Sequence, residues 1–367
     1  MNILVLLTDL FDKVGGIQTL NRFLVRAFSE IAEENNYRVT LLVLNDHKKT
    51  NNSSHYINSS HVRYLSFNGS RFQFITSVLY YAFNASVIFI GHINFSPLVI
   101  ALKLINLRTK ILQLIYGIEV SKKFPFLHSV GIRQVDKILS ISVDTKDKML
   151  TLNRINKNQF EILPCTLDPF YGEGVTLKTR EELLLPKGKM VLTVSRLEAS
   201  EKYKNVELII EAMPNILKEV PDAFYVIVGE GTDRHRLEAI ANNKAPNEKI
   251  IFKGSLSASD LDSYYNSCDI FVLPSTGEGF GIVFLEAMYH SKSCIGARTG
   301  GVPEVIEDGK TGILCEPNDV KSLSESIIRL LKDKSLSALM GKAGYERFND
   351  NFSFQIYKKK LKEIIIN

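Results

Sequence analysis

The fold of this chain is decided by the stretch IFVLPSTGEGFGIVFLE, which covers residues 270–286. Its first four residues, Ile270 to Leu273, form the apolar run expected of a buried strand, and the residues from Ile282 onward have helical character. Between them lies a loop with three glycines. Glycines let a ligand approach the backbone, and the free N–H groups at a helix start suit an anionic diphosphate. The stretch therefore predicts a strand, an anion-binding loop and a helix in succession.

The same alternation of short β-branched runs with helix-length amphipathic segments continues through the whole sequence. This pattern is typical of βαβ units with a parallel sheet, so the predicted fold class is α/β. Helical stretches include residues 18–33 and 71–83. The strand-like runs cover residues 3–7, 39–44, 62–67, 87–90, 110–115, 138–141, 160–163, 191–194, 223–228, 249–252, 269–273, 293–296 and 312–315.

The length of 367 residues corresponds to about two domains, each large enough to bury its own core. A stretch with prolines and glycines, residues 164–188, separates the two series of strands. Because ligands of open parallel sheets bind at the carboxyl ends of the strands, a cleft between the domains is the expected ligand site. Polar residues 46–60 predict a long exposed loop. The expected boundaries are a first domain over 1–165, a linker over 166–188, a second domain over 189–345 and a terminal helical segment, read as a surface helix, over 346–367.

The composition excludes several classes of protein. With 45% hydrophobic and 23% charged residues, the chain has the composition of an ordinary globular protein and not of a disordered one. Its four cysteines are far apart and form no C-x-x-C pair, which argues against a zinc site or a disulfide framework. The N-terminus lacks the pattern of a secretory signal, and the largely apolar region 78–100 is interrupted by polar residues. These features predict a cytoplasmic protein without a transmembrane helix.

The positive charge is concentrated in the first half of the chain. Residues 1–165 contain 19 Lys and Arg against 11 Asp and Glu, a net charge of +8, whereas the remainder has 26 against 29, a net charge of −3. A basic domain attracts phosphates or acidic lipid headgroups, although a solvated surface has the same composition. No nucleic-acid-binding motif accompanies the charge, so nucleic acid is not an expected partner.

Two further motifs precede the glycine-rich loop. Arg196 follows the strand over 191–194, and Lys204 comes near the start of the next helix, so the two cations are candidates to neutralise a diphosphate. The alternative is a set of surface ion pairs with Glu198 and Glu201. Near the N-terminus, Gly15 and Gly16 follow the first strand, where adjacent glycines allow positive φ angles and close approach of a ligand. The alternative is a plain loop.

Two carboxylates flank the start of the helix in the deciding stretch. Glu278 and Glu286 stand eight positions apart, so both are candidates to face one ligand. Carboxylates accept hydrogen bonds from sugar hydroxyls. The alternative is a glycine-rich turn with a solvated glutamate at each end.

Together these motifs resemble the retaining glycosyltransferases of family 4, which have the GT-B fold and transfer a sugar from a nucleotide-diphosphate donor. The resemblance covers essentially the whole chain and is strongest between Val191 and Pro317. The family's E-x-seven-E motif matches Glu278 through Glu286. Its remaining motifs match Arg196, Leu197 and Lys204 and the glycine pair Gly15 and Gly16, and a stretch that begins at Gly300-Gly301 supports the fold.

The resemblance implies roles for individual residues. Arg196 and Lys204 would bind the donor diphosphate, Glu286 the ribose hydroxyls and Glu278 the transferred sugar, which makes Arg196, Lys204 and Glu278 the candidate catalytic residues. The rest of the implied donor site consists of Gly15, Gly16, Gly254, Leu256, Phe280, Gly281, Ile282 and Val283.

The acceptor side departs from the family pattern. Many members have a histidine in the segment that resembles Tyr116 to Glu119, where this chain has Tyr116. The candidates on this side are therefore Tyr116, Glu119 and His92, which follows the strand over 87–90. A packed histidine is the alternative for His92.

The implied reaction is metal-independent and retains the anomeric configuration. Cleavage of the bond between the sugar and the diphosphate builds negative charge on the leaving group, which preorganised cations and amides stabilise. No enzymic nucleophile is evident, so front-face attack by the acceptor is expected, with a donor phosphate oxygen taking the proton. The pair Asp260 and Asp262 opens a predicted helix and is read as helix capping instead of a metal site. No cofactor is expected beyond the nucleotide-sugar co-substrate.

The expected partners are a nucleotide-sugar donor, a sugar or lipid-linked sugar acceptor, and an anionic membrane surface at the inner face of the cell membrane. Such a protein would serve in the synthesis of cell-surface polysaccharide or glycolipid. Two other functions remain open at this point. A nucleotide-sugar epimerase of the same fold would need acid and base groups around the sugar, and a noncatalytic nucleotide-sugar-binding subunit would not need an intact charged site.

Overall fold

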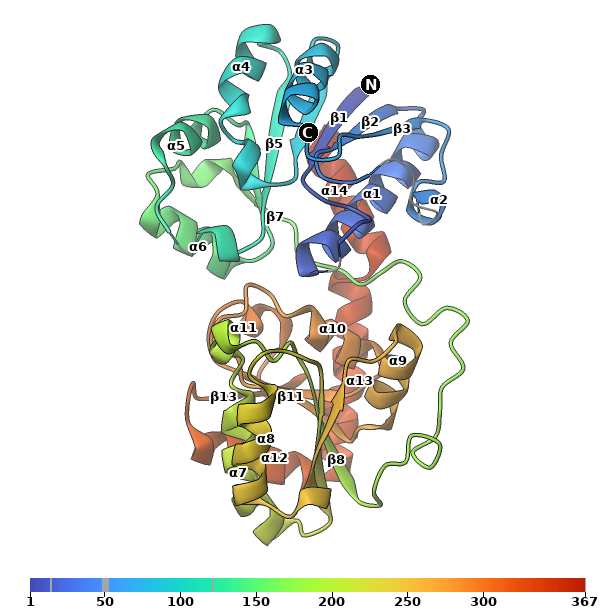
Figure 1. Cartoon of the computed structure of the whole chain (residues 1–367), viewed down its shortest axis with the longest axis vertical. Helices are drawn as coiled ribbons and strands as arrows, with labels where there is room; N and C mark the ends of the chain where they lie inside the picture. Colours follow the sequence, from blue (N-terminus) through green and yellow to red (C-terminus); the bar gives the residue numbers. More distant parts are fainter. Residues whose placement is uncertain (14, 48–52, 121, 367) are drawn as a thin grey trace. The chain divides into compact units, whose positions relative to one another are not determined.

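The computed structural model describes residues 1–13, 15–47, 53–120 and 122–366. The chain forms two compact units, the first made of Met1–Pro169 and Phe352–Asn367 and the second of Phe170–Asn351 (Figure 1). The predicted terminal segment 346–367 is therefore divided, because α13 (Lys334–Asn351) belongs to the second unit and α14 (Phe354–Ile366) belongs to the first.

The first unit is built on a seven-stranded parallel sheet with the strand order β3-β2-β1-β4-β5-β6-β7. Its central strands are buried on both faces, as expected of a sheet between two helical layers. The strands are β1 (Asn2–Leu7), β2 (Arg38–Val43), β3 (Val62–Ser66), β4 (Val87–Ile90), β5 (Lys110–Ile115), β6 (Lys137–Ser140) and β7 (Phe160–Ile162).

Helices cover both faces of this sheet. One face packs against α3 (Arg71–Ala82), α4 (Leu98–Ile105), α5 (Phe126–Arg133) and α6 (Val143–Leu152), whose buried side chains share one core with alternate residues of β1, β4 and β5. On the other face lies α1 (Gly16–Asn35), where the ring of Phe28 meets the ring of Phe89 at 5.2 Å. The remaining short helices are α2 (Ser53–Tyr56), η1 (Ile93–Phe95), η2 (Ile118–Val120) and η3 (Lys157–Gln159).

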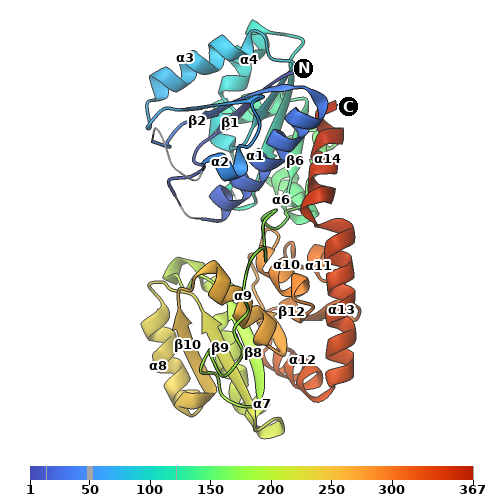
Figure 2. The ribbon, with the colours of Figure 1, turned by 90° about the vertical axis from the view of Figure 1, so that its right-hand side faces the viewer.

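The C-terminal helix α14 keeps one face exposed, at Lys359 and Glu363, and buries its other face in the first unit. It lies beside α1 (Figure 2), and Lys358 bonds to Glu30 at 2.7 Å and to Glu34 at 2.8 Å. Its side chains at Tyr357 and Leu361 are buried. Spacing of three and four residues places apolar side chains on one face of the helix, and this face packs into the first unit.

The second unit contains a six-stranded parallel sheet with the order β10-β9-β8-β11-β12-β13. Its strands are β8 (Lys189–Val194), β9 (Ala223–Val228), β10 (Ile250–Gly254), β11 (Ile270–Leu273), β12 (Ser293–Ala297) and β13 (Gly312–Cys315). Its helices are α7 (Val206–Glu219), α8 (Arg234–Lys244), α9 (Ala258–Ser267), α10 (Ile282–Tyr289), α11 (Val302–Val305), α12 (Val320–Lys332) and α13, with the 3-10 turns η4 (Ala199–Lys204) and η5 (Asn247–Lys249). One core joins α7, α8 and α12 to the sheet.

The predicted exposed loop over 46–60 differs from the structure at its first residue and in a short helix within it. Asp46 is buried, and its carboxylate accepts hydrogen bonds from the backbone N–H groups of Leu10 and Phe11, each at 2.9 Å. Residues 53–56 form α2, whereas 48–52 lie outside the described residues. The polar composition of this segment does not reveal the burial of Asp46, because the N–H groups of Leu10 and Phe11 lie more than thirty positions earlier in the chain.

Two further features of the fold concern the cysteines and the helices. All four cysteines are free and buried. Among the described residues, no helix combines the length and the apolar character that a bilayer span needs.

Candidate functional site

The loops that hold the predicted donor residues follow two neighbouring strands of the second unit. β8 and β11 pair in the sheet, although β9 and β10 separate them in the sequence. The strand order reverses at this point, and open α/β sheets bind ligands there, beyond the carboxyl ends of the strands. Arg196 and Lys204 follow β8, and Glu278 follows β11. The topology thus brings both motifs to one edge of one sheet.

A direct contact ties the two loops together through Tyr203. The backbone N–H of Thr276 donates to the carbonyl of Tyr203 at 2.8 Å. Gly277 packs against the Tyr203 ring so closely that a Cβ at this position would lie 2.6 Å from it. A larger residue would push the loops apart, so the first glycine of the motif is needed for packing.

Lys204 forms an ion pair with Glu278 across these loops. The lysine Nζ bonds to Glu278 Oε1, and the two side chains are only 17% and 13% exposed. Asn205, the residue after the lysine, has a left-handed backbone with φ 57°, and its side-chain amide donates to the carbonyl of Pro274 at 3.0 Å. Asn205 therefore fixes the direction in which the chain leaves Lys204.

The backbone around Glu278 is held by a second glycine pair. The N–H of Gly301 donates to the carbonyl of Glu278 at 2.9 Å, and Gly300, with φ 62°, has no room for a Cβ against the same carbonyl. Gly281 has φ 94° and leads into α10. The N–H groups of Ile282 and Val283 are in the first turn of that helix, where amides have no partner within the helix. A carboxylate paired with a lysine thus lies one short loop away from a helix N-terminus.

Glu286 lies about one turn into α10 and has a tyrosine as its partner. The hydroxyl of Tyr265 donates to Glu286 Oε2 at 2.6 Å. Burial raises the pKa of Glu286 to about 7, because a buried carboxylate loses its hydration, and the nearby Asp262 acts in the same direction. This carboxyl group is therefore poised to accept or share hydrogen bonds with hydroxyl groups near neutral pH.

The two aspartates of the D-x-D pair point to different partners. Asp260 lies within 2.5 Å of Lys178 and takes part in the cap of α9, where Ser257 is the capping residue and accepts from the N–H of Asp260. Asp262 is buried and lies 3.4 Å from Nε2 of His290. The capping interpretation thus describes the surroundings of Asp260 and is wrong for Asp262. Among the described residues, no group of three or more His, Cys, Asp or Glu side chains is arranged to hold a metal ion.

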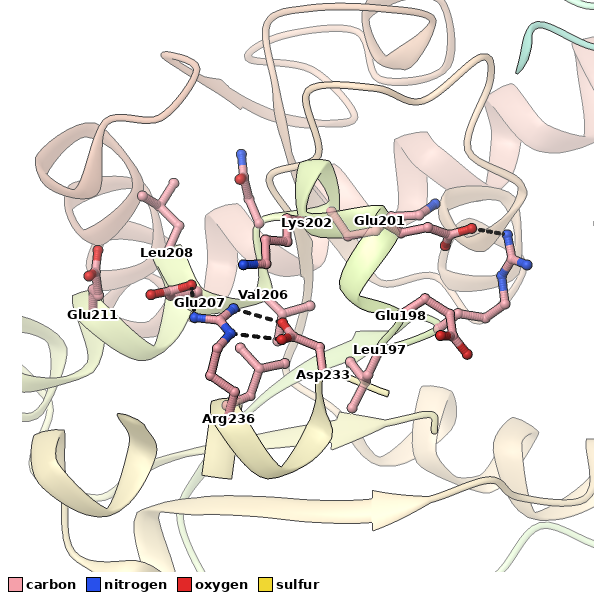
Figure 3. A pocket seen from close by; sticks show the side chains of 14 residues that line it. Leu197, Glu198, Glu201, Lys202, Val206, Glu207, Leu208, Glu211, Asp233 and Arg236 are labelled. Carbon is pink, nitrogen blue, oxygen red and sulfur yellow. Dashed lines mark hydrogen bonds and ion pairs between the residues drawn. The ribbon is translucent and has the colours of Figure 1, made fainter. Parts of the chain in front are cut away.

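Arg196 and Lys204 both line one cavity of the second unit. The Arg196 guanidinium bonds to Glu201 at 2.5 Å, as the ion-pair alternative predicts, and the arginine side chain is 65% exposed. The cavity has a volume of 250 Å³ (Figure 3). Its lining includes the carboxylates of Glu198, Glu201, Glu207, Glu211 and Asp233. The lining also contains the cations of Arg196, Lys202, Lys204 and Arg236, so the cavity carries charges of both signs.

Gly254 and Leu256, which the resemblance assigns to the donor site, lie further along the same edge. Gly254 ends β10 with φ 72°, and the N–H of Gly229 donates to its carbonyl at 2.9 Å. Leu256 follows in the next loop and is half-buried. Phe280 is 3% exposed, so its ring belongs to the interior of the unit.

The N-terminal glycine pair does not adopt the predicted backbone. Gly15 has φ 174°, an extended conformation that any residue adopts, and Gly16 is the first residue of α1. Neither glycine is in the left-handed region of φ. A Cβ at Gly16 would meet no atom within 4 Å, and one at Gly15 would meet only the end of the Gln18 side chain. The positive φ that adjacent glycines allow is therefore not used here, whereas the backbone at Gly16 has open space beside it.

The acceptor-side candidates gather at the carboxyl edge of the first sheet. His92 caps η1 after β4, and its Nδ1 accepts from the N–H of Asn94 at 3.2 Å. The proton of the neutral ring is then carried by Nε2, which lies 3.9 Å from Glu119 Oε1. Burial lowers the pKa of His92, whereas the carboxylate of Asp9 opposes this change.

Glu119 is the more perturbed member of this pair. Its Oε2 accepts from the N–H of Tyr116 at 2.9 Å, while Oε1 is buried and has no hydrogen-bond partner among the described residues. Burial raises the pKa of Glu119 to about 7. Tyr116 itself is buried, and its hydroxyl donates to Oδ1 of Asn21 at 2.6 Å, so the tyrosine supports the site from inside the unit.

Several residues of this arrangement have no motif in the sequence. Tyr203 and Asn205 flank the matched Lys204 in the sequence, and only the αL preference of asparagine hints at the turn. Tyr265 is 21 positions before its partner Glu286. Asp9 follows β1 without any flanking pattern.

The second unit is similar in sequence to a known protein family. Residues 176–347 match the family model described as "Glycosyl transferases group 1". The chain is 28% identical over 258 residues to the N-acetyl-alpha-D-glucosaminyl L-malate synthase of Bacillus anthracis, covering 69% of this chain and 66% of the relative. It is 30% identical over 195 residues to the GDP-mannose-dependent alpha-(1-6)-phosphatidylinositol monomannoside mannosyltransferase of Mycolicibacterium smegmatis, covering 51% of this chain and 50% of the relative. The chain spans between 30% and 66% of the length of the first curated relatives that it matches.

Solved structures share the fold over the whole chain. Alr3699/HepE of Anabaena in complex with UDP superposes with a TM-score of 0.82 at 16% identity, covering 99% of both chains. WaaG, a glycosyltransferase involved in lipopolysaccharide biosynthesis, superposes with a TM-score of 0.67 at 15% identity, also covering 99% of both chains. Both identities are low, so these likenesses carry the fold alone. Residues 176–347 are thus similar to the glycosyl transferases group 1 family, and the chain has the GT-B fold.

Proposed function

We propose that this protein transfers a glycosyl group from a nucleotide-diphosphate sugar to a hydroxyl group of an acceptor, with retention of the anomeric configuration and without a metal ion. The observation that carries the proposal is the Lys204–Glu278 ion pair beside the N-terminus of α10, at the point where the strand order of the second sheet reverses. A cation, a hydroxyl-binding carboxylate and free amides are the groups that a sugar diphosphate needs.

In this mechanism Lys204 and the first amides of α10 stabilise the leaving group. Cleavage of the bond between the anomeric carbon and the diphosphate oxygen leaves negative charge on that oxygen. Lys204, only 17% exposed, and the N–H groups of Ile282 and Val283 are held in place before the reaction begins. Preorganised donors of this kind lower the barrier because they need no rearrangement as the charge develops. Arg196, which now pairs with Glu201, would supply a second cation to the diphosphate.

The carboxyl groups orient the donor. Glu278 exchanges part of its interaction with Lys204 for hydroxyl groups of the transferred sugar when the donor binds. Glu286 binds the ribose hydroxyls, and its pKa of about 7 together with the bond from Tyr265 keeps the carboxyl group oriented near neutral pH. Gly254 and Leu256 border the nucleobase.

The acceptor hydroxyl attacks the anomeric carbon on the face that the diphosphate leaves. The bond from the acceptor oxygen to the anomeric carbon forms as the bond to the diphosphate breaks, and the acceptor proton goes to a phosphate oxygen of the leaving group. No enzymic nucleophile takes part. His92 and Glu119 orient the acceptor through Nε2 and the unpartnered Oε1.

The acceptor is a sugar or a lipid-linked sugar that binds the basic first unit. Among the similar proteins, the relative from Mycolicibacterium smegmatis is named for a phosphatidylinositol mannoside, and WaaG for lipopolysaccharide biosynthesis. The first name specifies a lipid-linked acceptor, and the second names the biosynthesis of a lipid-containing polysaccharide. A role in the synthesis of cell-surface polysaccharide or glycolipid at the cytosolic face of a membrane follows from these names and from the +8 charge of residues 1–165.

The test begins with the donor. A panel of UDP-, GDP- and ADP-sugars is compared for the rise in melting temperature that each gives, since a ligand that binds only the folded state stabilises it. Release of the nucleotide is then measured with and without candidate acceptors. Transfer to an acceptor supports the proposal. Interconversion of the donor sugar without transfer would identify an epimerase, and donor binding without turnover for every acceptor would identify a binding subunit.

A further inference from the structure

Helix α3 of the first unit carries apolar side chains on both of its faces. Phe74, Val78 and Ala82 are buried and pack into the core beneath the helix. Arg71 is the one charged residue of its twelve. A surface helix normally presents polar residues to water on the face opposite the core, so the composition of α3 is unusual for a helix at the surface of a unit.

The outer face of α3 is formed by large apolar residues that water can reach. Phe72, Tyr80 and Phe83, just after the helix end, are 79%, 75% and 68% exposed, and Ile75 lies between them. Spacings of three, five and eight residues along a helix place these side chains within one outward-facing stripe. The stripe runs along the whole length of α3.

The end of α4 extends this stripe. Leu104 and Leu107 are each 80% exposed. Asn106 lies between them, and its side-chain amide donates to the carbonyl of Phe83 at 3.3 Å, so the ends of α3 and α4 lie side by side. We call the surface formed by Phe72, Ile75, Tyr80, Phe83, Leu104 and Leu107 the α3–α4 face. Contiguous apolar surface of this kind is rare on soluble monomers unless it binds something.

The charge around the α3–α4 face has one sign. Residues 71–133 contain seven Lys and Arg and a single acidic residue, Glu119, whose side chain is only 6% exposed. Arg71 and Arg108 directly flank the face, and neither has an ion-pair partner among the described residues. These cations are therefore available to an anionic surface.

A basic groove opens at the same end of the unit. It has a volume of 390 Å³, and its lining includes Arg38, His61 and Arg63 together with Tyr81 and Asn84, which flank Phe83 in the sequence. No acidic residue is among the described residues that line it. The guanidinium of Arg63 lies 5.7 Å from the centre of the Tyr81 ring. An anionic headgroup fits this lining.

We propose that the α3–α4 face docks on an anionic lipid bilayer, with α3 in the plane of the interface and the groove at its end occupied by a lipid headgroup. An amphipathic surface that combines aromatic and aliphatic side chains with cations is the chemistry that such an interface binds. A second copy of the chain is a poorer occupant, because two such faces would bring like charges together. The inference specifies the membrane contact of the proposed function, but lipid binding itself requires neither donor nor acceptor.

The experiment is sedimentation of the full chain with vesicles of phosphatidylcholine alone and of phosphatidylcholine mixed with phosphatidylglycerol. The parent is expected to bind the mixed vesicles and not the neutral ones. The double variant Phe83→Ser/Leu107→Ser should bind at least about tenfold more weakly. Two apolar side chains that leave water when the face docks on the bilayer are then absent. The matched control is Leu184→Ser/Leu339→Ser, two residues of the second unit that are 85% and 65% exposed and should not affect binding.

A second pair of variants tests the groove. Arg38→Gln/Arg63→Gln should weaken binding by roughly fivefold for each cation removed, and the parent should bind less as salt rises. Equal binding to neutral vesicles, parent-like binding of the Phe83/Leu107 variant, or equal loss in the control would overturn the proposal. The proposal would also be overturned if the parent formed dimers in solution and only the Phe83/Leu107 variant were monomeric. Nucleotide release from a water-soluble acceptor, measured without vesicles, separates failure of this proposal from failure of the proposed function.

Discussion

Replacing Lys204 by methionine tests the proposed stabilisation of the leaving group most directly. Methionine keeps an unbranched side chain of similar length and removes only the charge and its hydrogen bonds. If Lys204 stabilises the departing diphosphate, kcat is expected to fall by a hundredfold or more, which corresponds to about 2.7 kcal/mol of lost transition-state stabilisation. The donor KM should change much less, because the developing charge exists only in the transition state.

The same substitution also has a consequence for folding. Glu278, 13% exposed, loses its cation and keeps a largely buried negative charge. Removal of one partner from such a pair is expected to cost about 1–3 kcal/mol of unfolding free energy, less than for a fully buried pair because both side chains retain some contact with water. The double variant Lys204→Met/Glu278→Gln should recover most of this stability, but not the turnover.

The control and the assay separate charge from position. Lys202 belongs to the same turn, η4, and is exposed, so Lys202→Met removes an equal charge at a distance of two residues and should stay within about twofold of the parent rate. Turnover is measured as nucleotide release at saturating donor, and folding by thermal unfolding. A Lys204→Met protein that is folded and turns over within about threefold of the parent would refute the role given to Lys204.

Three further predictions concern Arg196, metal ions and Glu119. Arg196→Ala should lower turnover by a hundredfold or more without a change in melting temperature, because this side chain is 65% exposed; a parent-like rate would leave Arg196 with only its ion pair to Glu201. Turnover should persist in EDTA, and complete loss that magnesium or manganese restores would contradict the metal-independent mechanism and return attention to Asp260 and Asp262. Burial raises the pKa of Glu119 from 4.5 to about 7, so between these values the folded protein keeps a proton that the unfolded chain has lost, and stability falls as pH rises. The fall attributable to Glu119 is roughly 3 kcal/mol; denaturant unfolding of Glu119→Gln between pH 5 and pH 8 should show a smaller pH dependence than the parent, and identical curves would show that burial does not perturb this group.

The strands of both sheets are predictable because their signal is local. Each of the thirteen runs identified in the sequence coincides with a strand within about two residues, since a strand buried on both faces needs an uninterrupted apolar segment. Ile282 to Tyr289 is likewise a helix over the predicted residues.

The partners within the site are set by tertiary contacts that no local pattern encodes. Lys204 has Glu201 nearby in the sequence, yet its partner is Glu278, 74 positions away. Arg196 pairs with Glu201, as the sequence allows. Asp46 lies in a polar segment but is buried, because two backbone N–H groups and the Tyr64 hydroxyl need an acceptor there. Sequence spacing shows which groups reach one sheet edge, whereas the choice among them depends on the packing of the loops.

The position of α14 in the first unit has a consequence for the synthesis of the protein. Residues 1–169 leave the ribosome long before residues 352–366, although α14 supplies buried side chains to the first unit and Lys358 neutralises Glu30 and Glu34 on α1. Domains generally fold as they emerge, the N-terminal one first. Here the nascent first unit must wait, with one flank of α1 uncovered, until the second unit has been translated. The cell therefore completes the two units in the order opposite to that in which their first strands are made.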